Sequence, residues 1–263
     1  NLLIALGLGI SLYLLGRRFS TQIHNRLLQF TLFFLLFLLC LPGLSYILYY
    51  LHFFDDSLWY IRFRSIPYVE ILSAGWGLFF GFAAIFLNDI ILRKWADKYF
   101  FWFCVIFILI PFMNPIIRPV GSSAGYNYRW DSNLCMESNQ GLRGPVCLST
   151  IFKYYERFKL QREIVKSTYP CSTGTEIWYL IRFLKKNGFK VEYLTGQKAS
   201  AIPVPAILGN TLHHTGEFVV LMSKDESRYI IGDPLKGWIT LTPEQFEQFY
   251  HEFNKFIIYI TPD

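Results

Sequence analysis

Four apolar stretches in the first 117 residues constrain this chain more than any other feature. They run from Leu2 to Leu15, from Leu27 to Tyr50, from Tyr68 to Leu92 and from Tyr99 to Ile117. A helix needs about 20 apolar residues to cross the hydrocarbon core of a bilayer, and the last three stretches reach that length. The sequence therefore predicts an integral membrane protein with about four transmembrane helices within residues 1–117.

The rest of the chain has the composition of a water-soluble domain. Residues 1–117 hold eight Lys or Arg and five Asp or Glu, whereas residues 118–263 hold 17 and 14. We expect a linker over residues 118–133, which includes the Gly-Ser-rich segment 121–125, and a soluble domain over 134–263. Each part carries a net charge of +3, so the overall charge of +6 indicates membrane topology and not a nucleic-acid partner.

The basic residues of the first part predict its orientation. They gather in the first and third loops, at Arg17, Arg18, Arg26, Arg93, Lys94 and Lys98. Loops rich in Lys and Arg stay in the cytoplasm, so the crossing after the third loop places the soluble domain on the extracytoplasmic side.

In the soluble part, predicted helices come first and predicted strands later, which is typical of an α+β domain. Helices are expected from Pro145 to about Phe158, over residues 161–166, and from an N-cap at Thr175 to a stop at Gly188. Strands are expected over residues 190–194, 204–208, 218–222, 229–231, 238–241 and 255–260, with a helix opened by Thr242-Pro243-Glu244.

Several short motifs within residues 134–260 resemble one known family. They are Gly144-Pro145-Val146-Cys147-Leu148, Phe152-Lys153-Tyr154-Tyr155, Thr173-Gly174-Thr175, Gly188, Phe218-Val219-Val220-Leu221, Asp233-Pro234 and Gly237. Together they resemble the papain-like cysteine peptidases that remove double-glycine leaders from bacteriocins. The resemblance implies an α+β papain-like peptidase fold and a location in a bacterial inner or plasma membrane. We expect no cofactor or metal, because the chain lacks a Cys-x-x-Cys pair and His213-His214 is a poor metal signature.

The residues that carry catalysis in that family differ here. The family has a Cys immediately before the Gly-Pro, a Gln six residues earlier for the oxyanion hole, and a His immediately before the Phe-Val-Val strand, oriented by the Asp of Asp-Pro. In this sequence the nucleophile position holds Arg143, the oxyanion position holds Glu137 and the base position holds Glu217, whereas Asp233 is retained.

These substitutions change the chemistry. A guanidinium stays protonated and has no lone pair with which to attack a carbonyl, so Arg143 is not a nucleophile. An ionised Glu137 accepts hydrogen bonds and would repel an oxyanion. The charges compensate one another, however, and we expect a salt-bridged cluster of Arg143 and Glu217 with Asp233 and Glu137 nearby.

Other residues could take over the chemistry. Cys147 lies one helical turn beyond the nucleophile position and Gln140 precedes it by seven residues, so that a shifted triad of Cys147, His214 and Asp233 is an alternative. Against it, Cys147 falls on the apolar stripe of its predicted helix, where a Cys usually serves as a small hydrophobic residue. If the domain is extracytoplasmic, a disulfide between Cys135 and Cys171 is expected.

The leading hypothesis is a membrane-anchored, catalytically degenerate peptidase domain that binds a peptide or protein partner in its cleft, alongside peptide-export machinery. The first alternative is an active cysteine peptidase, through Cys147 or in a natural form that has the usual residues. The second is a structural subunit of a membrane export complex. Membrane lipid is an expected partner in all three cases.

Overall fold

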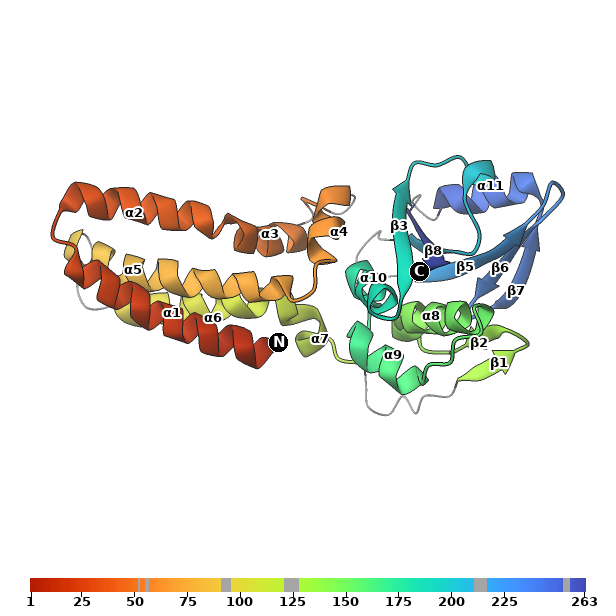
Figure 1. Ribbon diagram of the computed structural model, residues 1–263, viewed down its shortest axis with the longest axis horizontal. Helices are drawn as coiled ribbons and strands as arrows, with labels where there is room; N and C mark the ends of the chain where they lie inside the picture. The colour runs from red at the N-terminus through yellow and green to blue at the C-terminus, as the bar shows by residue number, and fades with distance from the viewer. Residues whose placement is uncertain (52, 55–56, 91–95, 121–127, 211–216, 253–255) are drawn as a thin grey trace. The chain divides into compact units, whose positions relative to one another are not determined.

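The chain forms two compact units. The computed structural model describes residues 1–51, 53–54, 57–90, 96–120, 128–210, 217–252 and 256–263 (Figure 1). The N-terminal unit comprises Asn1–Asp55 and Pro67–Met113, and the C-terminal unit comprises Asp56–Ile66 and Asn114–Asp263. The short segment between two apolar stretches therefore belongs to the C-terminal unit.

The N-terminal unit is helical. Its elements are α1 (Leu2–Gln22), α2 (Arg26–Leu39), α3 (Leu41–Tyr50), the 3-10 helix η1 (Val69–Ala74), α5 (Gly75–Ile90), α6 (Ala96–Leu109) and the 3-10 helix η2 (Ile110–Phe112), before α7 (Met113–Ile117). Helix α5 packs against both α1 and α6. Glycines bring α1 and α5 together, since a Cβ at Gly77 or Gly81 would lie 2.0 Å from a carbonyl oxygen of α1. The Gly-xxx-Gly pair thus forms a helix-packing face.

Among the described residues of this unit, two helices are long and apolar enough to cross a membrane. They cover Leu2–Gln22 and Val69–Asn88, and a third span results if α2 and α3, bent by 52° relative to each other, count as one. The bend falls at Cys40, just before Pro42, and a proline within a helix commonly kinks it. The first helix extends beyond the predicted stretch 2–15 and includes Arg17 and Arg18. The prediction of about four spans stays a prediction, since Lys98–Phe112 is apolar but shorter.

The C-terminal unit contains a six-stranded antiparallel sheet in the order β3-β8-β4-β5-β6-β7. The strands are β3 (Phe189–Thr195), β4 (Ala206–Asn210), β5 (Glu217–Lys224), β6 (Tyr229–Asp233), β7 (Gly237–Leu241) and β8 (Phe256–Pro262). The helices are α4 (Leu58–Arg64), α8 (Arg143–Tyr154), α9 (Gln161–Thr168), α10 (Ile177–Lys186) and α11 (Pro243–Glu252). Two short strands, β1 (Arg129–Asp131) and β2 (Leu134–Met136), form a separate hairpin.

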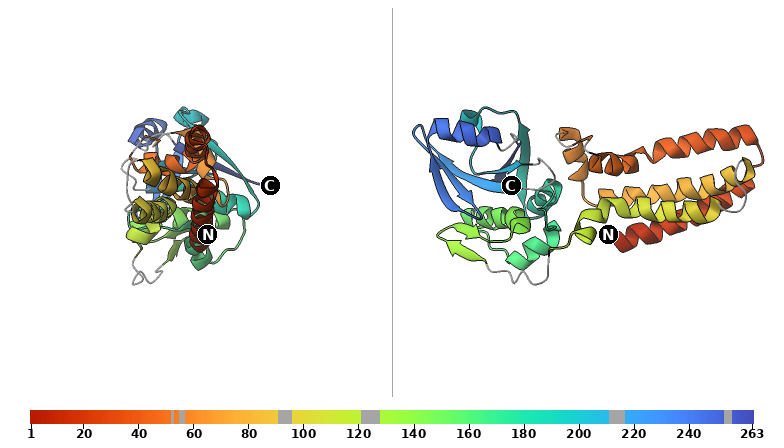
Figure 2. Two further views of the ribbon diagram at one scale, coloured as in Figure 1. Left: turned by 90° about the vertical axis from the view of Figure 1, so that its left-hand side faces the viewer. Right: turned by 180° about the vertical axis from the view of Figure 1, so that it is seen from behind.

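Helices cover the sheet on both faces. Helix α8 packs against β5, and α11 lies on the opposite side of the sheet (Figures 1 and 2). On the α11 side Phe246 stacks on Tyr229, with ring centroids 4.2 Å apart, within an apolar cluster that includes Val219 and Leu221. Because both faces are covered, consecutive residues of β5 from Phe218 to Leu221 are all buried.

The α+β fold predicted from the sequence is confirmed, with small corrections to element boundaries. Helix α8 starts at Arg143, two residues before the predicted start. The predicted N-cap Thr175 is wrong, because Glu176 occupies that position and the Thr175 hydroxyl instead donates to the Gly141 carbonyl at 3.3 Å. The hairpin β1–β2 was not expected from the sequence.

Helix α4 is held on the C-terminal unit by a buried cation. The Arg64 side chain is fully buried, and its guanidinium lies 4.3 Å from the ring centroid of Trp178 on α10. Its Nη1 donates to the Tyr60 hydroxyl at 3.1 Å, and Arg182 donates to the Arg64 carbonyl. Arg64 therefore joins a segment far away in the sequence to the core of this unit.

Replacing Arg64 with Ala should lower the melting temperature of the C-terminal unit by about 4–8 °C, because losing a desolvated cation–π contact costs about 2 kcal/mol. Thermal unfolding of the full chain in detergent measures the shift. Arg62→Ala, at an exposed position of the same helix, is the matched control and should change stability by less than about 0.5 kcal/mol. Equal effects of the two variants would show that Arg64 does not hold α4 in place.

Candidate functional site

The candidate site begins at the N-terminus of α8, where the backbone is tightly packed. A Cβ at Gly144 would lie 3.0 Å from the Cβ of Thr175 and 3.2 Å from Leu180. A Cβ at Gly141, just before the helix, would lie 2.4 Å from the Cys171 carbonyl oxygen. Glycine at these two positions lets the start of α8 sit directly against the segment that leads into α10.

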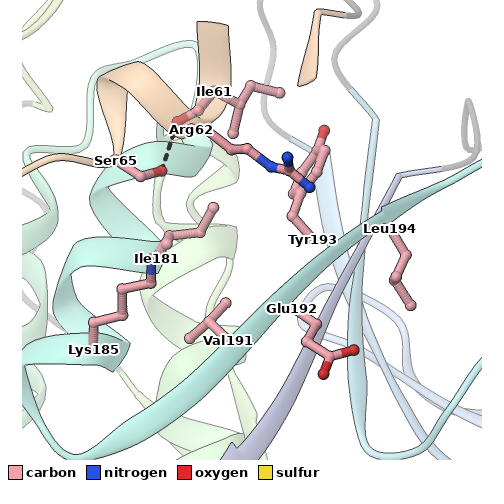
Figure 3. Close-up of a pocket in the computed structure, with 9 residues that line it drawn as sticks. All are labelled: Ile61, Arg62, Ser65, Ile181, Lys185, Val191, Glu192, Tyr193 and Leu194. Carbon is pink, nitrogen blue, oxygen red and sulfur yellow. Dashed lines mark hydrogen bonds between the residues drawn. The ribbon is translucent and has the colours of Figure 1, made fainter. Parts of the chain in front are cut away.

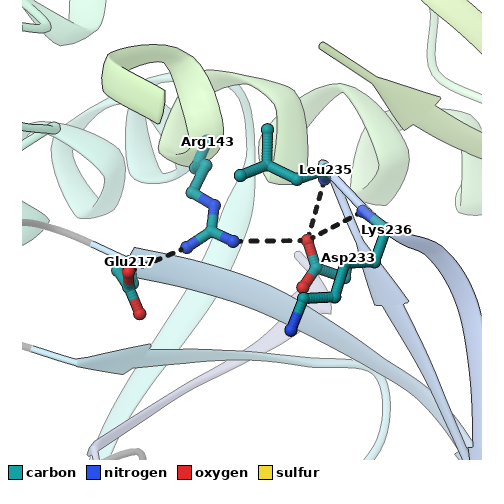
Figure 4. A network of polar contacts seen from close by, with 5 residues as sticks. All are labelled: Arg143, Glu217, Asp233, Leu235 and Lys236. Atoms are coloured by element: carbon teal, nitrogen blue, oxygen red, sulfur yellow. Dashed lines mark hydrogen bonds and ion pairs between the residues drawn. The ribbon is translucent and has the colours of Figure 1, made fainter. Parts of the chain in front are cut away.

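Arg143, the first residue of α8, lies between two carboxylates (Figure 4). Its Nη1 is 3.3 Å from Oε1 of Glu217, at the start of β5, and its Nη2 is 3.4 Å from Oδ1 of Asp233, at the end of β6. The Arg143 and Asp233 side chains are only 8% and 4% exposed, whereas that of Glu217 is 49% exposed. The salt-bridged cluster expected from the sequence is therefore present, with one buried and one half-exposed ion pair.

The two carboxylates compensate an unfavourable position for a cation. The N-terminus of a helix carries a partial positive charge that disfavours a guanidinium and favours an anion. Asp233 is itself held in place, because its Oδ1 accepts hydrogen bonds from the backbone N–H groups of Leu235 at 2.8 Å and Lys236 at 3.3 Å. The turn between β6 and β7 thus presents a fixed carboxylate to Arg143.

Glu137 lies beside this cluster and makes different contacts. Its Oε1 accepts from the Ser138 hydroxyl and the Asn139 backbone N–H, both at 3.2 Å, and its own N–H donates to the Pro234 carbonyl at 3.1 Å. Its Oε2 is buried and has no hydrogen-bond partner among the described residues. We expected Glu137 near the cluster, and it contacts the β6–β7 turn that also holds Asp233. In the described part of the chain, however, no ion pair joins Glu137 to Arg143.

A hollow of about 290 Å³ adjoins the cluster. It is lined by Arg129, Met136, Glu137, Ser138, Pro234 and Leu235. The β6–β7 turn is common to the hollow and to the carboxylate that binds Arg143. A ligand in this hollow would therefore meet the buried acid Glu137 and lie next to the ion pairs.

Cys147 lies one turn further along α8 and is fully buried. Burial raises the pKa of its thiol well above the ordinary value of 9.0; nearby Asp233 adds to the rise and Arg143 opposes it. A nucleophilic Cys needs a lowered pKa and access to substrate, and Cys147 has neither. Gln140 is exposed on a 3-10 helix (Gln140–Leu142) before α8, and His214 lies outside the described residues.

The expected disulfide between Cys135 and Cys171 is wrong, because both are free thiols. The Cys135 sulfur accepts a hydrogen bond from Gln161 at 3.2 Å and packs with Leu142. The Cys171 sulfur is 3.1 Å from the Thr173 hydroxyl. Burial raises the pKa of Cys135 to about 12, so this thiol acts as a small core residue.

The antiparallel sheet with α8 packed on it defines an α+β domain, and the ion-pair cluster lies at the start of that helix. The model of the Peptidase C39 family matches residues 132–263. The chain therefore belongs to the Peptidase C39 family. No curated protein matches it.

Several solved structures are similar to about half of the chain. The peptidase domain of Streptococcus ComA, a bi-functional ABC transporter involved in a quorum-sensing pathway, is 18% identical over 49% of this chain and 96% of its own, with a TM-score of 0.43. A double-glycine-motif protease from an AMS/PCAT transporter, in complex with the leader peptide, is 18% identical over 49% of this chain and 89% of its own, with a TM-score of 0.43. The peptidase domain of Streptococcus mutans ComA is 16% identical over 49% of this chain and 99% of its own, with a TM-score of 0.34.

The two ion pairs of Arg143 should differ in their contribution to stability. Arg143→Met leaves the buried Asp233 without its cation, and removing one partner of a buried ion pair costs about 3–5 kcal/mol. Glu217→Gln affects a half-exposed pair and should cost about 0–1 kcal/mol. Pulse proteolysis of the full chain in urea measures both values. If Glu217→Gln destabilised the domain as much as Arg143→Met, the buried pair with Asp233 would not be the dominant contact.

Proposed function

We propose that this protein is a membrane-anchored, catalytically degenerate member of the Peptidase C39 family that binds a peptide or protein partner without cutting it. The observation that carries the proposal is the ion-paired, buried Arg143 at the helix N-terminus where the resemblance predicts the nucleophile. A guanidinium bound to two carboxylates offers no electron pair to a peptide carbonyl.

The neighbouring residues support the same proposal. Acyl transfer needs hydrogen-bond donors aimed at the developing oxyanion, whereas Glu137 presents carboxylate oxygens. The alternative nucleophile Cys147 is buried and its pKa is raised. The hollow beside Glu137 keeps room for part of a ligand, so binding is retained in this proposal while cleavage is lost.

We base the proposed kind of ligand on the family to which the chain belongs. The proteins similar in structure include a double-glycine-motif protease solved with a leader peptide. We propose that a peptide of this class, in an export system, is the partner of the C39 domain. The family membership and the hollow beside Glu137 support this assignment.

Cleavage and binding can be tested together. The full chain in detergent is incubated with a synthetic double-glycine leader peptide and with a thiol-directed activity probe. We expect the peptide mass to stay unchanged, Cys147 to stay unlabelled, and fluorescence anisotropy to show binding of the intact peptide. The matched comparison is the triple variant Arg143→Cys, Glu217→His and Glu137→Gln, which restores the residues typical of the family and should become labelled at position 143.

Two results would overturn the proposal. One is cleavage by the unaltered chain that disappears in Cys147→Ala, which would make the protein an active peptidase. The other is absence of peptide binding by the folded chain. In that case the domain would serve as a structural subunit only.

We also propose that the N-terminal unit crosses the membrane four times. Residues 56–66 and 114–263 form one compact unit and must lie on one side of any membrane. The segment between them contains Val69–Asn88, which is long enough to cross, so a second crossing must bring the chain back. The apolar segment Lys98–Phe112 is the candidate for that return. In this proposal the basic first and third loops face the cytoplasm, and the C39 domain therefore lies outside it.

Single cysteines at exposed positions, in a chain without its own cysteines, test this topology. In intact cells a membrane-impermeant maleimide should label Arg62→Cys and Glu226→Cys, whereas Arg18→Cys should react only after permeabilisation. Opposite accessibility of positions 62 and 226 would contradict the four crossings. Labelling of position 18 alone in intact cells would agree with four crossings but would show the opposite orientation, with the C39 domain in the cytoplasm.

A further inference from the structure

A second hollow, of about 420 Å³, lies within the C-terminal unit where α4 and α10 face β3 (Figure 3). It is lined by Ile61, Arg62, Ser65, Ile181, Lys185, Val191, Glu192, Tyr193 and Leu194. It shares no residue with the cluster around Arg143. In the strand order β3 is three steps from β5, which at about 4.8 Å per step places the hollow about 14 Å from the strand of Glu217.

The hollow follows the edge of the sheet. Strand β3 stands at the end of the strand order, and β8 is its single neighbour in the described sheet. Successive side chains of a strand point to opposite faces, yet all four residues from Val191 to Leu194 line the hollow. A hollow on one face would be lined by every second residue. The space therefore runs along the outer edge of β3, which is the position where an added strand forms main-chain hydrogen bonds.

The charges around the hollow favour an anion. Arg62 on α4 and Lys185 on α10 are both exposed, and within the described ranges neither has an ion-pair partner. Glu192 is the single acid among the lining residues, so the cations are in excess. A carboxylate that enters between Arg62 and Lys185 would gain two charge-assisted hydrogen-bond donors.

We propose that this hollow binds an extended peptide segment with an acidic side chain, which adds to β3 as a strand and places its carboxylate between Arg62 and Lys185. The edge of β3 supplies the main-chain contacts, and the two cations supply selectivity for the acid. Because one wall is α4, the bound segment also contacts the part of the chain that lies between two apolar helices. This site is separate from the one proposed to bind the leader-type peptide.

A set of three labelled peptides tests the proposal on the full chain in detergent. Each has seven residues of alternating Thr and Val, with Glu, Gln or Lys at the central position. Fluorescence anisotropy should show that the Glu peptide binds about fivefold more tightly than the Gln peptide, the effect expected of two exposed ion pairs of modest strength, and that the Lys peptide binds most weakly. Hydrogen exchange should slow in β3 when the Glu peptide is bound.

Charge reversal distinguishes specific binding from loss of folding. The double variant Arg62→Glu with Lys185→Glu should prefer the Lys peptide over the Glu peptide, a gain that requires a folded site. Lys186→Glu, at an exposed position of α10 outside the hollow, should keep the original order. The proposal is overturned if the three peptides bind equally, if protection appears at β5 and β6 in place of β3, or if the double variant folds but keeps the original preference.

Discussion

The buried ion pair between Arg143 and Asp233 is the interaction on which the candidate site depends. It joins the first residue of α8 to the last residue of β6, and the same carboxylate fixes the β6–β7 turn through the backbone of Leu235 and Lys236. That turn in turn holds Glu137 through the Pro234 carbonyl. Each of the two partners is buried, so neither charge is stable without the other.

In the proposed account the pair also explains how the fold of the Peptidase C39 family can be kept while catalysis is lost. The positive end of α8 would stabilise a thiolate, whereas here it faces a guanidinium, and two carboxylates are needed to offset the repulsion. Where the resemblance predicts an anionic thiolate, this site therefore has a cation, and the carboxylates of Glu217 and Asp233 balance its charge. In the proposed account the molecule offers two binding environments, a hollow where Glu137 and Arg129 carry opposite charges and a hollow with an excess of cations at Arg62 and Lys185.

Much of the domain could be predicted from the sequence because its local patterns agree with its fold. The amphipathic α10 and the strands of the sheet appear within a few residues of their expected positions. The cluster could be predicted because motifs next to positions 143, 217 and 233 fix the register. The role of α4 could not be predicted, because Arg64 lies between two apolar stretches, where a charged residue usually belongs to a loop. Its contact with the distant Trp178 is visible only in the folded structure. The disulfide prediction failed because the packing of Cys135 beside Gln161 is a tertiary feature.

The coupling between Arg143 and Asp233 is the most direct test of the central claim. A double-mutant cycle compares the unfolding free energies of the unaltered chain, Arg143→Met, Asp233→Asn and the variant with both changes. If the buried pair organises the site, the double variant should be less destabilised than the sum of the single variants by about 2–3 kcal/mol, since removing both charges leaves neither one unpaired. Additive effects, with a coupling near zero, would contradict the account.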